Sequence, residues 1–296
     1  TAYEIPKRDW SSDVCSSDLR PTAKTFAGER AWFEWESGLS QRLIEYGKRR
    51  GASLFMTLLA SVNALLHRYT RQRDIVLGSP VAGRNHADLE DQIGFYVNTL
   101  ALRSRMDPAQ TFESFLDATV ALTTEALDHQ IYPFDRLVND LRLRRDMSRS
   151  PLFDVMIVLQ NTSFPTLRLQ GLRLAPFPFE TNASQFDLTF SFEERERKLR
   201  GEITFNTDLF SRASIERMTR HLRTLIEGFL AAPRTPLGRL PLLSASERNT
   251  LRSVGRASDP GETVIDRFQR QVSLAPDATA VTFDATHLSY HELNER

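Results

Sequence analysis

Three short blocks of the chain carry the residue types that can do chemistry. They read IGFYVNTL at residues 93–100, HQIYPFD at 129–135 and RDMSRSPL at 145–152. Each places glycine or proline, apolar side chains and a polar group within a few positions, which is typical of a shaped loop. In the first block, Asn98 offers a donor and an acceptor to a carbonyl or an oxyanion. The alternative is that Asn98 caps a strand end or closes a turn.

Histidines and carboxylates add no second chemical centre. The six histidines are His67, His86, His129, His221, His287 and His291. No two are adjacent, and His67 has no partner at metal-site spacing, so it is interpreted as a helix-boundary or surface residue. Asp135 and Asp146 could in principle act as general bases. Charge at a helix N-terminus or pairing with arginine suits both better, and no metal site is predicted.

Bulk composition limits the class of protein. The 296 residues include 38 basic and 38 acidic side chains, so no net charge draws the chain to nucleic acid or an anionic membrane. Cys15 is the single cysteine, which excludes an internal disulfide and a cysteine-based zinc cluster. No apolar run reaches the roughly 18 residues of a membrane span, and the first ten residues lack a signal-peptide pattern. A cytoplasmic protein is expected.

Helices and strands must position the three blocks. Helices are predicted at residues 40–50, 54–69, 111–128 and 133–141, and a long one after Ser211, with Ser53, Thr111 and Ser211 as caps. Buried strands are predicted at 74–78, 97–102 and 152–159, and a hairpin at 186–192 and 199–205 with a five- or six-residue connection. The helix at 111–128 is expected to turn six side chains inward: Phe112, Phe115, Leu116, Thr119, Val120 and Leu127.

This order of elements predicts an α/β fold, a mixed sandwich rather than a doubly wound nucleotide fold, because the sequence has no G-x-G-x-x-G or phosphate-loop motif. Residues 1–19 repeat Ser-Ser-Asp without any period; they read either as a loop or as a segment foreign to the domain. Residues 20–232 form the main domain. Residues 233–262 are rich in proline, glycine and serine and are interpreted as a linker, and residues 263–296 begin something new.

The three blocks resemble the fifth, sixth and seventh motifs of nonribosomal peptide synthetase condensation domains, in order and at plausible spacing. The GERAWF stretch at 28–33 resembles the segment that precedes the second lobe in that family. Ile131 stands where the family usually has Asp, and Ser150 where it often has Asn. The resemblance implies a chloramphenicol acetyltransferase-like sandwich, of which residues 20–232 are the C-terminal lobe.

The resemblance also implies a reaction. In this family, the amine of an aminoacyl group attacks an acyl thioester, and both groups are held on the phosphopantetheine arms of carrier domains. The family signature H-H-x-x-x-D-G lies in the N-terminal lobe, and its second histidine is thought to position the amine or accept its proton. That signature is absent from these 296 residues. No catalytic residue is therefore expected here, and the chain alone is expected to be inactive.

By resemblance, Asn98, Gly94 and Phe95 belong to the wall of the substrate tunnel. A further set holds structural positions in the motifs: His129, Pro133, Phe134, Asp146 and Arg149. Arg149 is expected to pair with the signature aspartate of the other lobe, with Arg84 and Arg68 as rivals that the sequence does not separate.

The tail motif LSYHEL at 288–293 resembles the first motif of adenylation domains. No cofactor is expected to bind directly, and ATP with magnesium would need a complete adenylation domain. Expected partners are carrier domains, the N-terminal lobe and the rest of the adenylation domain, but neither nucleic acid nor membrane. Two alternatives remain open: an inert module that docks carrier proteins, and a free-standing acyltransferase of the chloramphenicol acetyltransferase type.

Overall fold

The computed structural model describes residues 20–84, 86–89, 92–143, 146–160, 182–254, 263–283 and 286–295. The segment 1–19, which the sequence marks as anomalous, lies outside the described residues. The chain divides into two compact units, residues 1–242 and residues 243–296, and each is described by itself.

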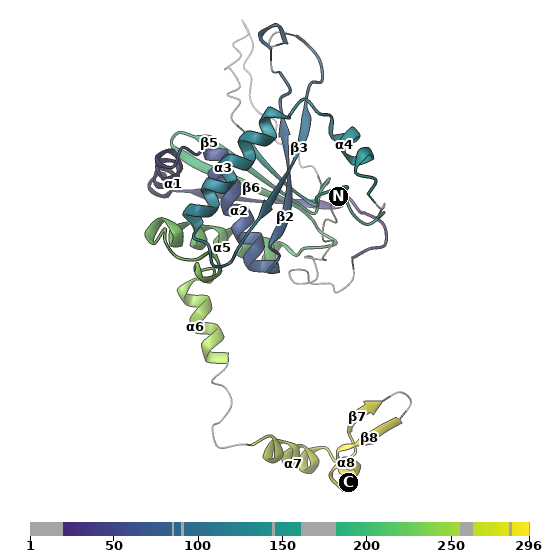
Figure 1. Cartoon of the computed structure of the whole chain (residues 1–296). Helices are drawn as coiled ribbons and strands as arrows, with labels where there is room; N and C mark the ends of the chain where they lie inside the picture. Colours follow the sequence, from purple (N-terminus) through teal and green to yellow (C-terminus); the bar gives the residue numbers. More distant parts are fainter. Residues whose placement is uncertain are drawn as a thin grey trace, which may run out of the picture. The chain divides into compact units, whose positions relative to one another are not determined.

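A mixed six-stranded sheet forms the centre of the first unit (Figure 1). Its strands are β1 (Gly28–Trp35), β2 (Asp74–Val81), β3 (Asn98–Arg105), β4 (Val155–Gln160), β5 (Leu188–Arg195) and β6 (Lys198–Asn206). Their order is β1-β6-β5-β4-β2-β3. β4 runs parallel to both β2 and β5, and the other neighbours are antiparallel. The mixed sheet confirms the predicted α/β class.

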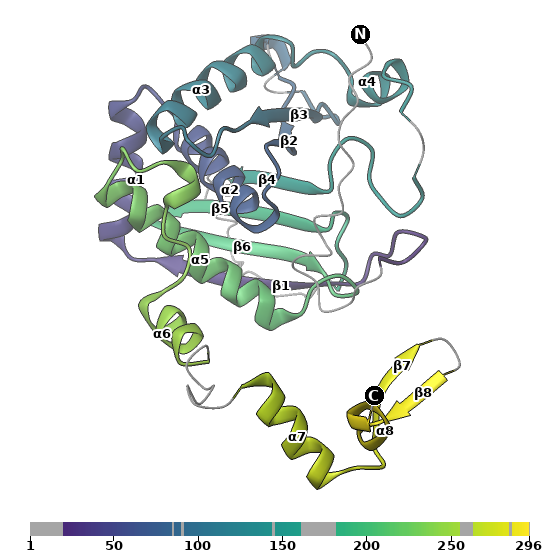
Figure 2. The same cartoon turned by 60° about the horizontal axis from the view of Figure 1, so that its bottom comes forward.

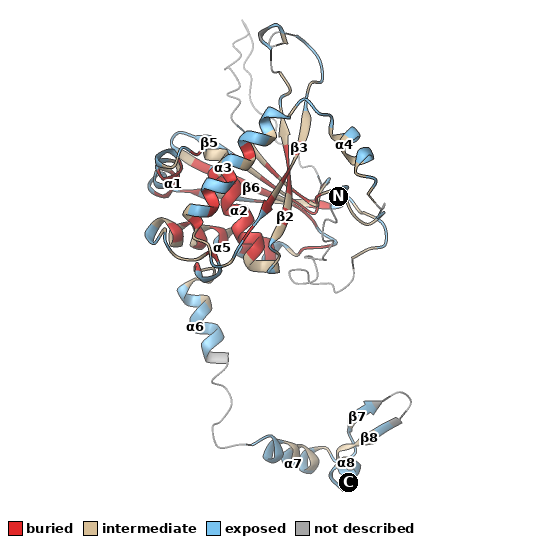
Figure 3. Cartoon of the chain, in the orientation of Figure 1, coloured by how far each residue is buried: buried red, intermediate tan, exposed pale blue. Residues whose placement is uncertain are grey.

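Four helices cover one face of this sheet, as Figure 2 shows: α1 (Ser37–Arg49), α2 (Leu54–Thr70), α3 (Phe112–Asp128) and α5 (Arg212–Ala231). A shorter helix, α4 (Phe134–Asp140), follows the second sequence block. The hydroxyls of Ser53, Thr111 and Ser211 each accept a hydrogen bond from the backbone three residues on, so the predicted caps are confirmed. Buried residues concentrate where these helices meet the sheet (Figure 3).

The β5–β6 hairpin is tighter than the sequence predicts. Only Glu196 and Arg197 connect the two strands, and both have positive φ, 54° and 65°. Two such residues form the type I′ turn that matches the twist of a hairpin. The prediction of a five- or six-residue connection is wrong because this turn lacks the usual Asn-Gly or Asp-Gly signal, and because the strand ends it joins are charged and exposed.

Three further details differ from the sequence predictions. No element was predicted over β1, which pairs with β6 along its whole length. β2 continues through Pro80 to Val81, beyond the strand predicted at 74–78. Only Gly78 of β2 pairs with β4, so Pro80 needs no N–H on that side. Leu127 is 37% exposed rather than buried, because the inward face of α3 continues through Thr123 and Ala126 instead.

The predicted linker contains ordered structure. Leu237 and Leu240, in and beside a short 3-10 helix (Leu237–Arg239), are buried within the first unit. Pro236 bridges to Thr111 at the start of α3. The second unit contains α6 (Ala245–Val254), α7 (Val264–Leu274), β7 (Thr279–Phe283), β8 (Thr286–Ser289) and α8 (Tyr290–Glu295). The sequence did not predict α6, because the proline and glycine around it outweighed its capping pair, Ser244 and Glu247.

Candidate functional site

The three sequence blocks precede three neighbouring elements of the first unit. The first leads into β3, the second into α4, and the third toward β4, whose neighbour β2 also pairs with β3. α4 lies against β3. The fold therefore brings together loops that the sequence separates by about fifty residues.

Asn98 joins the first block to the second. Its Nδ2 donates to the carbonyl oxygens of Gln130 and Tyr132, each at 2.8 Å. Its Oδ1 accepts from the backbone N–H of Phe134 at 3.1 Å. The side chain that the sequence assigns to the tunnel wall thus makes three bonds to one loop of its own chain.

Aromatic rings join the second block to the third. The ring of Phe134 lies 5.5 Å from that of Phe153, and Phe153 lies 5.5 Å from Phe186. Phe153 is 4% exposed and fills the space above Gly78, where a Cβ would lie 2.1 Å from its ring. The absence of a side chain on Gly78 therefore makes room for the ring, a role that the sequence pattern did not reveal.

The loop before β3 presents apolar groups to solvent. Ile93 is fully exposed and Phe95 is 89% exposed. Arg84 lies over the ring of Tyr96, 4.6 Å from its centroid, and donates to the carbonyl of Leu89. A Cβ on Gly94 would lie 2.9 Å from this same ring of Tyr96. A side chain at position 94 would therefore clash within the loop itself, whether or not a substrate is present.

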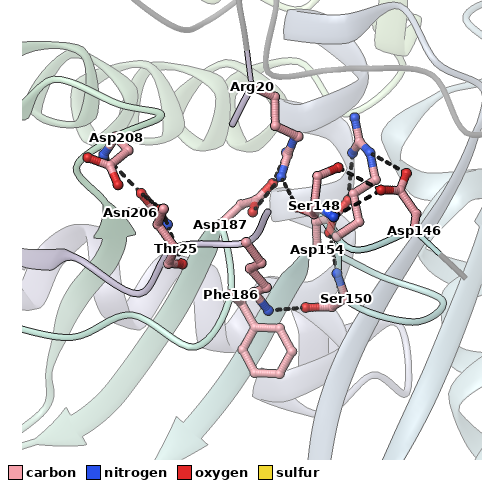
Figure 4. Close-up of polar contacts among 12 residues, drawn as sticks. Arg20, Thr25, Asp146, Ser148, Ser150, Asp154, Phe186, Asp187, Asn206 and Asp208 are labelled. Atoms are coloured by element: carbon pink, nitrogen blue, oxygen red, sulfur yellow. Dashed lines mark hydrogen bonds and ion pairs between the residues drawn. The ribbon is translucent and has the colours of Figure 1, made fainter. Parts of the chain in front are cut away.

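Arg149 of the third block is paired within the chain. Its Nη1 lies 2.7 Å from Asp154, and Asp146 lies 4.0 Å from its Nε. The contact with Arg149 is the arginine-partner role expected for Asp146. Asp146 also accepts hydrogen bonds from the backbone N–H and the hydroxyl of Ser148, a turn contact that was not predicted. Figure 4 shows these contacts around the short turn that leads to Ser150.

The same network includes residues that the sequence analysis missed. Arg20 pairs with Asp187 and also donates to the carbonyl of Ser148 at 3.1 Å, and Lys24 donates to Ser150 (Figure 4). Burial raises the pKa of Asp187, against the opposing effect of the Arg20 hydrogen bond. Burial disfavours the charged form of Lys24 as well, and for an amine this lowers the pKa. Nothing in the pattern around residues 20–24 indicated partners more than a hundred residues away.

The remaining candidates have simpler positions. His129 is exposed at the C-terminal end of α3, Pro133 is the N-cap residue of α4, and Asp135 lies in its first turn. Arg68 is half-buried and donates to the carbonyl oxygens of Leu237 and Leu240, so it holds the ordered part of the linker. Among the described residues, no group of histidine, cysteine and carboxylate side chains could hold a metal ion.

A hollow of about 620 Å³ lies between β3, α3 and α4. Its lining is mainly apolar and includes Ala101, Phe115, Leu122, Leu137, Leu141 and Leu152.

The described helices include none long and apolar enough to cross a membrane.

Comparison with known proteins places this arrangement in a family. The family model for the condensation domain matches residues 6–252. Tyrocidine synthase 3 of Brevibacillus parabrevis is 37% identical over 99% of the chain, and bacitracin synthase 3 of Bacillus licheniformis is 38% identical over 99%. The chain spans only 4% and 5% of the lengths of these two relatives.

Solved structures show the same fold. A four-domain nonribosomal peptide synthetase bound to AMP and glycine superposes with a TM-score of 0.76, at 23% identity, over 96% of this chain and 24% of its own. The X-domain from teicoplanin biosynthesis superposes with a TM-score of 0.71, at 23% identity, over 79% of this chain and 56% of its own. The first condensation domain of the calcium-dependent antibiotic synthetase gives a TM-score of 0.60 over 76% of this chain and 51% of its own.

Proposed function

This chain belongs to the condensation domain family, and from that membership we propose that residues 20–232 are the C-terminal lobe of a domain that forms peptide bonds between carrier-bound thioesters. One observation carries the proposal. The two loops that precede β3 and α4 are joined by Asn98 and present Ile93, Phe95 and Ile131 to solvent. An apolar loop surface of this kind suits a wall that a second lobe and a substrate arm cover.

The coverage of solved structures supports a single lobe. The chain matches 56% of the teicoplanin X-domain chain and 51% of the first condensation domain of the calcium-dependent antibiotic synthetase. The sequence itself contains no adjacent pair of histidines. In the proposed arrangement, the H-H-x-x-x-D-G histidine is encoded outside these 296 residues and faces the loops that they supply.

The proposed reaction is acyl transfer from sulfur to nitrogen. The amine of the acceptor attacks the thioester carbonyl of the donor, a C–N bond forms, and the C–S bond breaks. The amine loses a proton, and the departing thiolate of the donor phosphopantetheine gains one, so no oxidant or further reactant is needed. The present chain contributes the wall that orients the arms, with Gly94, Phe95 and Asn98 in the loop nearest to them.

The signature aspartate of the other lobe needs a cationic partner. We retain Arg149 and Arg84 as candidates, since both lie in or beside the loops of the site. All three guanidinium groups already have partners within the chain: Arg149 pairs with Asp154, Arg84 donates to the carbonyl of Leu89, and Arg68 donates to those of Leu237 and Leu240. Arg68 suits the role less well, because its partners belong to the linker and not to the loops of the site.

Residues 263–296 of the second unit are proposed to be the start of an adenylation domain. The LSYHEL motif spans the end of β8 and α8, where Glu292 and Ser289 exchange hydrogen bonds. On α7, Val264 is 86%, Ile265 66% and Leu274 73% exposed, as expected of a helix whose partner lies in further chain. ATP and magnesium would act only in a complete adenylation domain.

A test uses a complete condensation domain that contains residues 20–254. Replacing Phe95 by Ser, and separately Ile131 by Ser, is expected to lower dipeptidyl thioester formation about tenfold with little change in thermal midpoint, because each removes roughly one buried apolar contact. The matched control is Leu251→Ser, an exposed apolar side chain of α6 in the second unit. Unchanged condensation in both loop variants would overturn the proposed wall.

The same assay separates the two alternatives. An inert docking module would bind loaded carriers but yield no product in any complete form. A free-standing acyltransferase would acylate a small amine from acetyl-coenzyme A without carriers. Product that requires both loaded carriers excludes each of them.

A further inference from the structure

Asn98 fastens the backbone of residues 130–134 to the start of β3 through three hydrogen bonds. We propose that Asn98 is a positioning residue: it caps α4 from a neighbouring strand and holds the 129–133 loop in place, without donating to the substrate. The effect on catalysis rests on the function proposed above. The three hydrogen bonds of Asn98, called the clamp below, do not depend on that function, because their effect on the loop can be measured in the chain alone.

α4 lacks a cap of its own. The first N–H groups of a helix have no partner within the helix, and a Ser, Thr, Asp or Asn at the N-cap normally accepts from one of them. The N-cap residue of α4 is Pro133, whose side chain has no acceptor. Asn98 Oδ1 instead accepts from Phe134 N, 36 residues away in the sequence. The helix is thus capped from the adjoining strand.

The amide of Asn98 has no donor left for a ligand. A primary amide carries two N–H hydrogens, and Nδ2 directs its bonds to the carbonyl oxygens of Gln130 and Tyr132, both at 2.8 Å. A donor to an incoming thioester carbonyl would have to release one of these carbonyls. Stabilisation of an oxyanion depends on donors that are already oriented and unengaged, so the geometry favours positioning over direct contact.

The loop held by Asn98 carries two side chains that are exposed to solvent, and the residue that follows it packs against the third block. Ile131 is 78% exposed and Tyr132 44% exposed, while the next aromatic ring, Phe134, turns onto Phe153. Tyr132 is further held by its hydroxyl, which donates to Asp140 of α4. Release of the Asn98 bonds would therefore free the exposed pair Ile131 and Tyr132 and loosen the N-terminus of α4.

Hydrogen exchange on the 296-residue chain tests the clamp. Asn98→Ala removes all three bonds, and Asn98→Asp keeps an acceptor for Phe134 N but places a carboxylate against two carbonyl oxygens. Both variants are expected to raise amide exchange within residues 130–137 about tenfold, the size of effect that a lost cap or hydrogen bond produces. Thr99→Ala, one residue along β3, is the control. Unchanged exchange in both Asn98 variants would overturn the clamp.

A local cap gives a sharper test. In the Asn98→Ala background, Pro133→Ser supplies a hydroxyl at the N-cap, whereas Pro133→Ala does not. A serine hydroxyl at the N-cap accepts from the second or third N–H of the helix, so the proposal expects Ser, and not Ala, to restore slow exchange at Asp135 to Leu137. Equal exchange in the two double variants would contradict capping by Asn98.

Kinetics in a complete condensation domain then separate positioning from contact. Positioning predicts that Asn98→Ala raises KM for a loaded carrier more than it lowers kcat, and that Pro133→Ser recovers part of the loss. A donor to the oxyanion would instead lower kcat by about 100-fold or more, with no recovery from a local cap. That second pattern would overturn the proposal. Faster exchange with unaltered kinetics would retain the clamp and count against the proposed function of the loop.

Discussion

The guanidinium of Arg20 and the carboxylate of Asp187 form a buried ion pair between positions 167 residues apart in the chain. The Arg20 side chain is 7% exposed and that of Asp187 is 2% exposed. Arg20 reaches from the segment before β1 to the residue just before β5, and it also binds the carbonyl of Ser148. This pair connects the beginning of the domain to the third sequence block.

Arg20→Met is expected to destabilise the first unit by about 3–5 kcal/mol at neutral pH, because it leaves a carboxylate buried without its partner. Urea unfolding followed by circular dichroism measures this change. Asp187→Asn removes the buried negative charge but leaves the Arg20 guanidinium without a carboxylate, and it serves as the comparison. Loss of less than about 1 kcal/mol in Arg20→Met would mean that solvent screens the pair as it does on a surface.

The pH dependence of this pair has a definite sign. Burial raises the pKa of Asp187 in the folded protein. Between the ordinary carboxyl value and the raised one, the folded chain binds more protons than the unfolded chain, so the free energy of unfolding falls as pH rises through that window. Arg20 lowers the pKa of Asp187, so its replacement by Met raises that pKa further and extends this pH range upward. The variant should therefore lose less stability at pH 5 than at pH 8; a larger loss at pH 5 would contradict this account.

Gly78→Ala tests the packing of Phe153. The new Cβ would lie 2.1 Å from the Phe153 ring, so overpacking is expected to cost about 1–3 kcal/mol. Phe153→Leu shortens the opposing side chain and should recover part of that loss when combined with Gly78→Ala. Thermal midpoints of the two single variants and the double variant give the coupling. Strict additivity would show that the ring moves aside freely.

Local patterns predicted much of this fold. Caps at Ser53, Thr111 and Ser211 depend on residue type and position alone, and helical periodicity identified most of the buried face of α3. The mixed sheet followed from alternating helices and strands plus one hairpin. The caps and the buried helix face were predictable because each rests on interactions within a few residues, and the sheet class was predictable because it follows from the order of the elements.

What the sequence did not reveal depends on distant partners. β1 is a strand because it pairs with β6, and its own pattern is too irregular to show alternation. Arg20 and Lys24 have their partners more than a hundred residues away. Asn98 was recognised as important, but its three backbone partners belong to a loop whose position depends on the folding of α3 and α4. Sequence spacing cannot specify such bonds.

Arg68→Met is expected to loosen the segment that leaves the first unit. Arg68 is half-buried and donates to Leu237 and Leu240, and burial lowers its pKa. Loss of these bonds should speed limited proteolysis or amide exchange at residues 237–242 about tenfold while changing the core little. Arg71→Met, an exposed cation just after α2, is the control. Equal rates in the two variants would show that Leu237 and Leu240 hold this segment by burial alone.

The exposed loop residues predict self-association of the chain. Ile93 and Phe95 are almost wholly exposed, and Ile131 and Tyr132 of the loop that Asn98 holds are exposed as well. Light scattering at rising concentration should show oligomers, and Ile93→Ser with Phe95→Ser should shift the population toward monomer. A parent chain that stays monodisperse at high concentration would count against an apolar wall that a second lobe normally covers.

Reconstitution shows whether these residues need a second lobe to form a peptide bond. The chain is incubated with a donor carrier and an acceptor carrier, both loaded, with and without a separately produced N-terminal lobe that carries H-H-x-x-x-D-G, and dipeptidyl thioester is detected by mass spectrometry. We expect product only when that lobe is present, and loss of product when its second histidine is replaced by alanine. Dipeptidyl thioester formed by the 296-residue chain alone would contradict it.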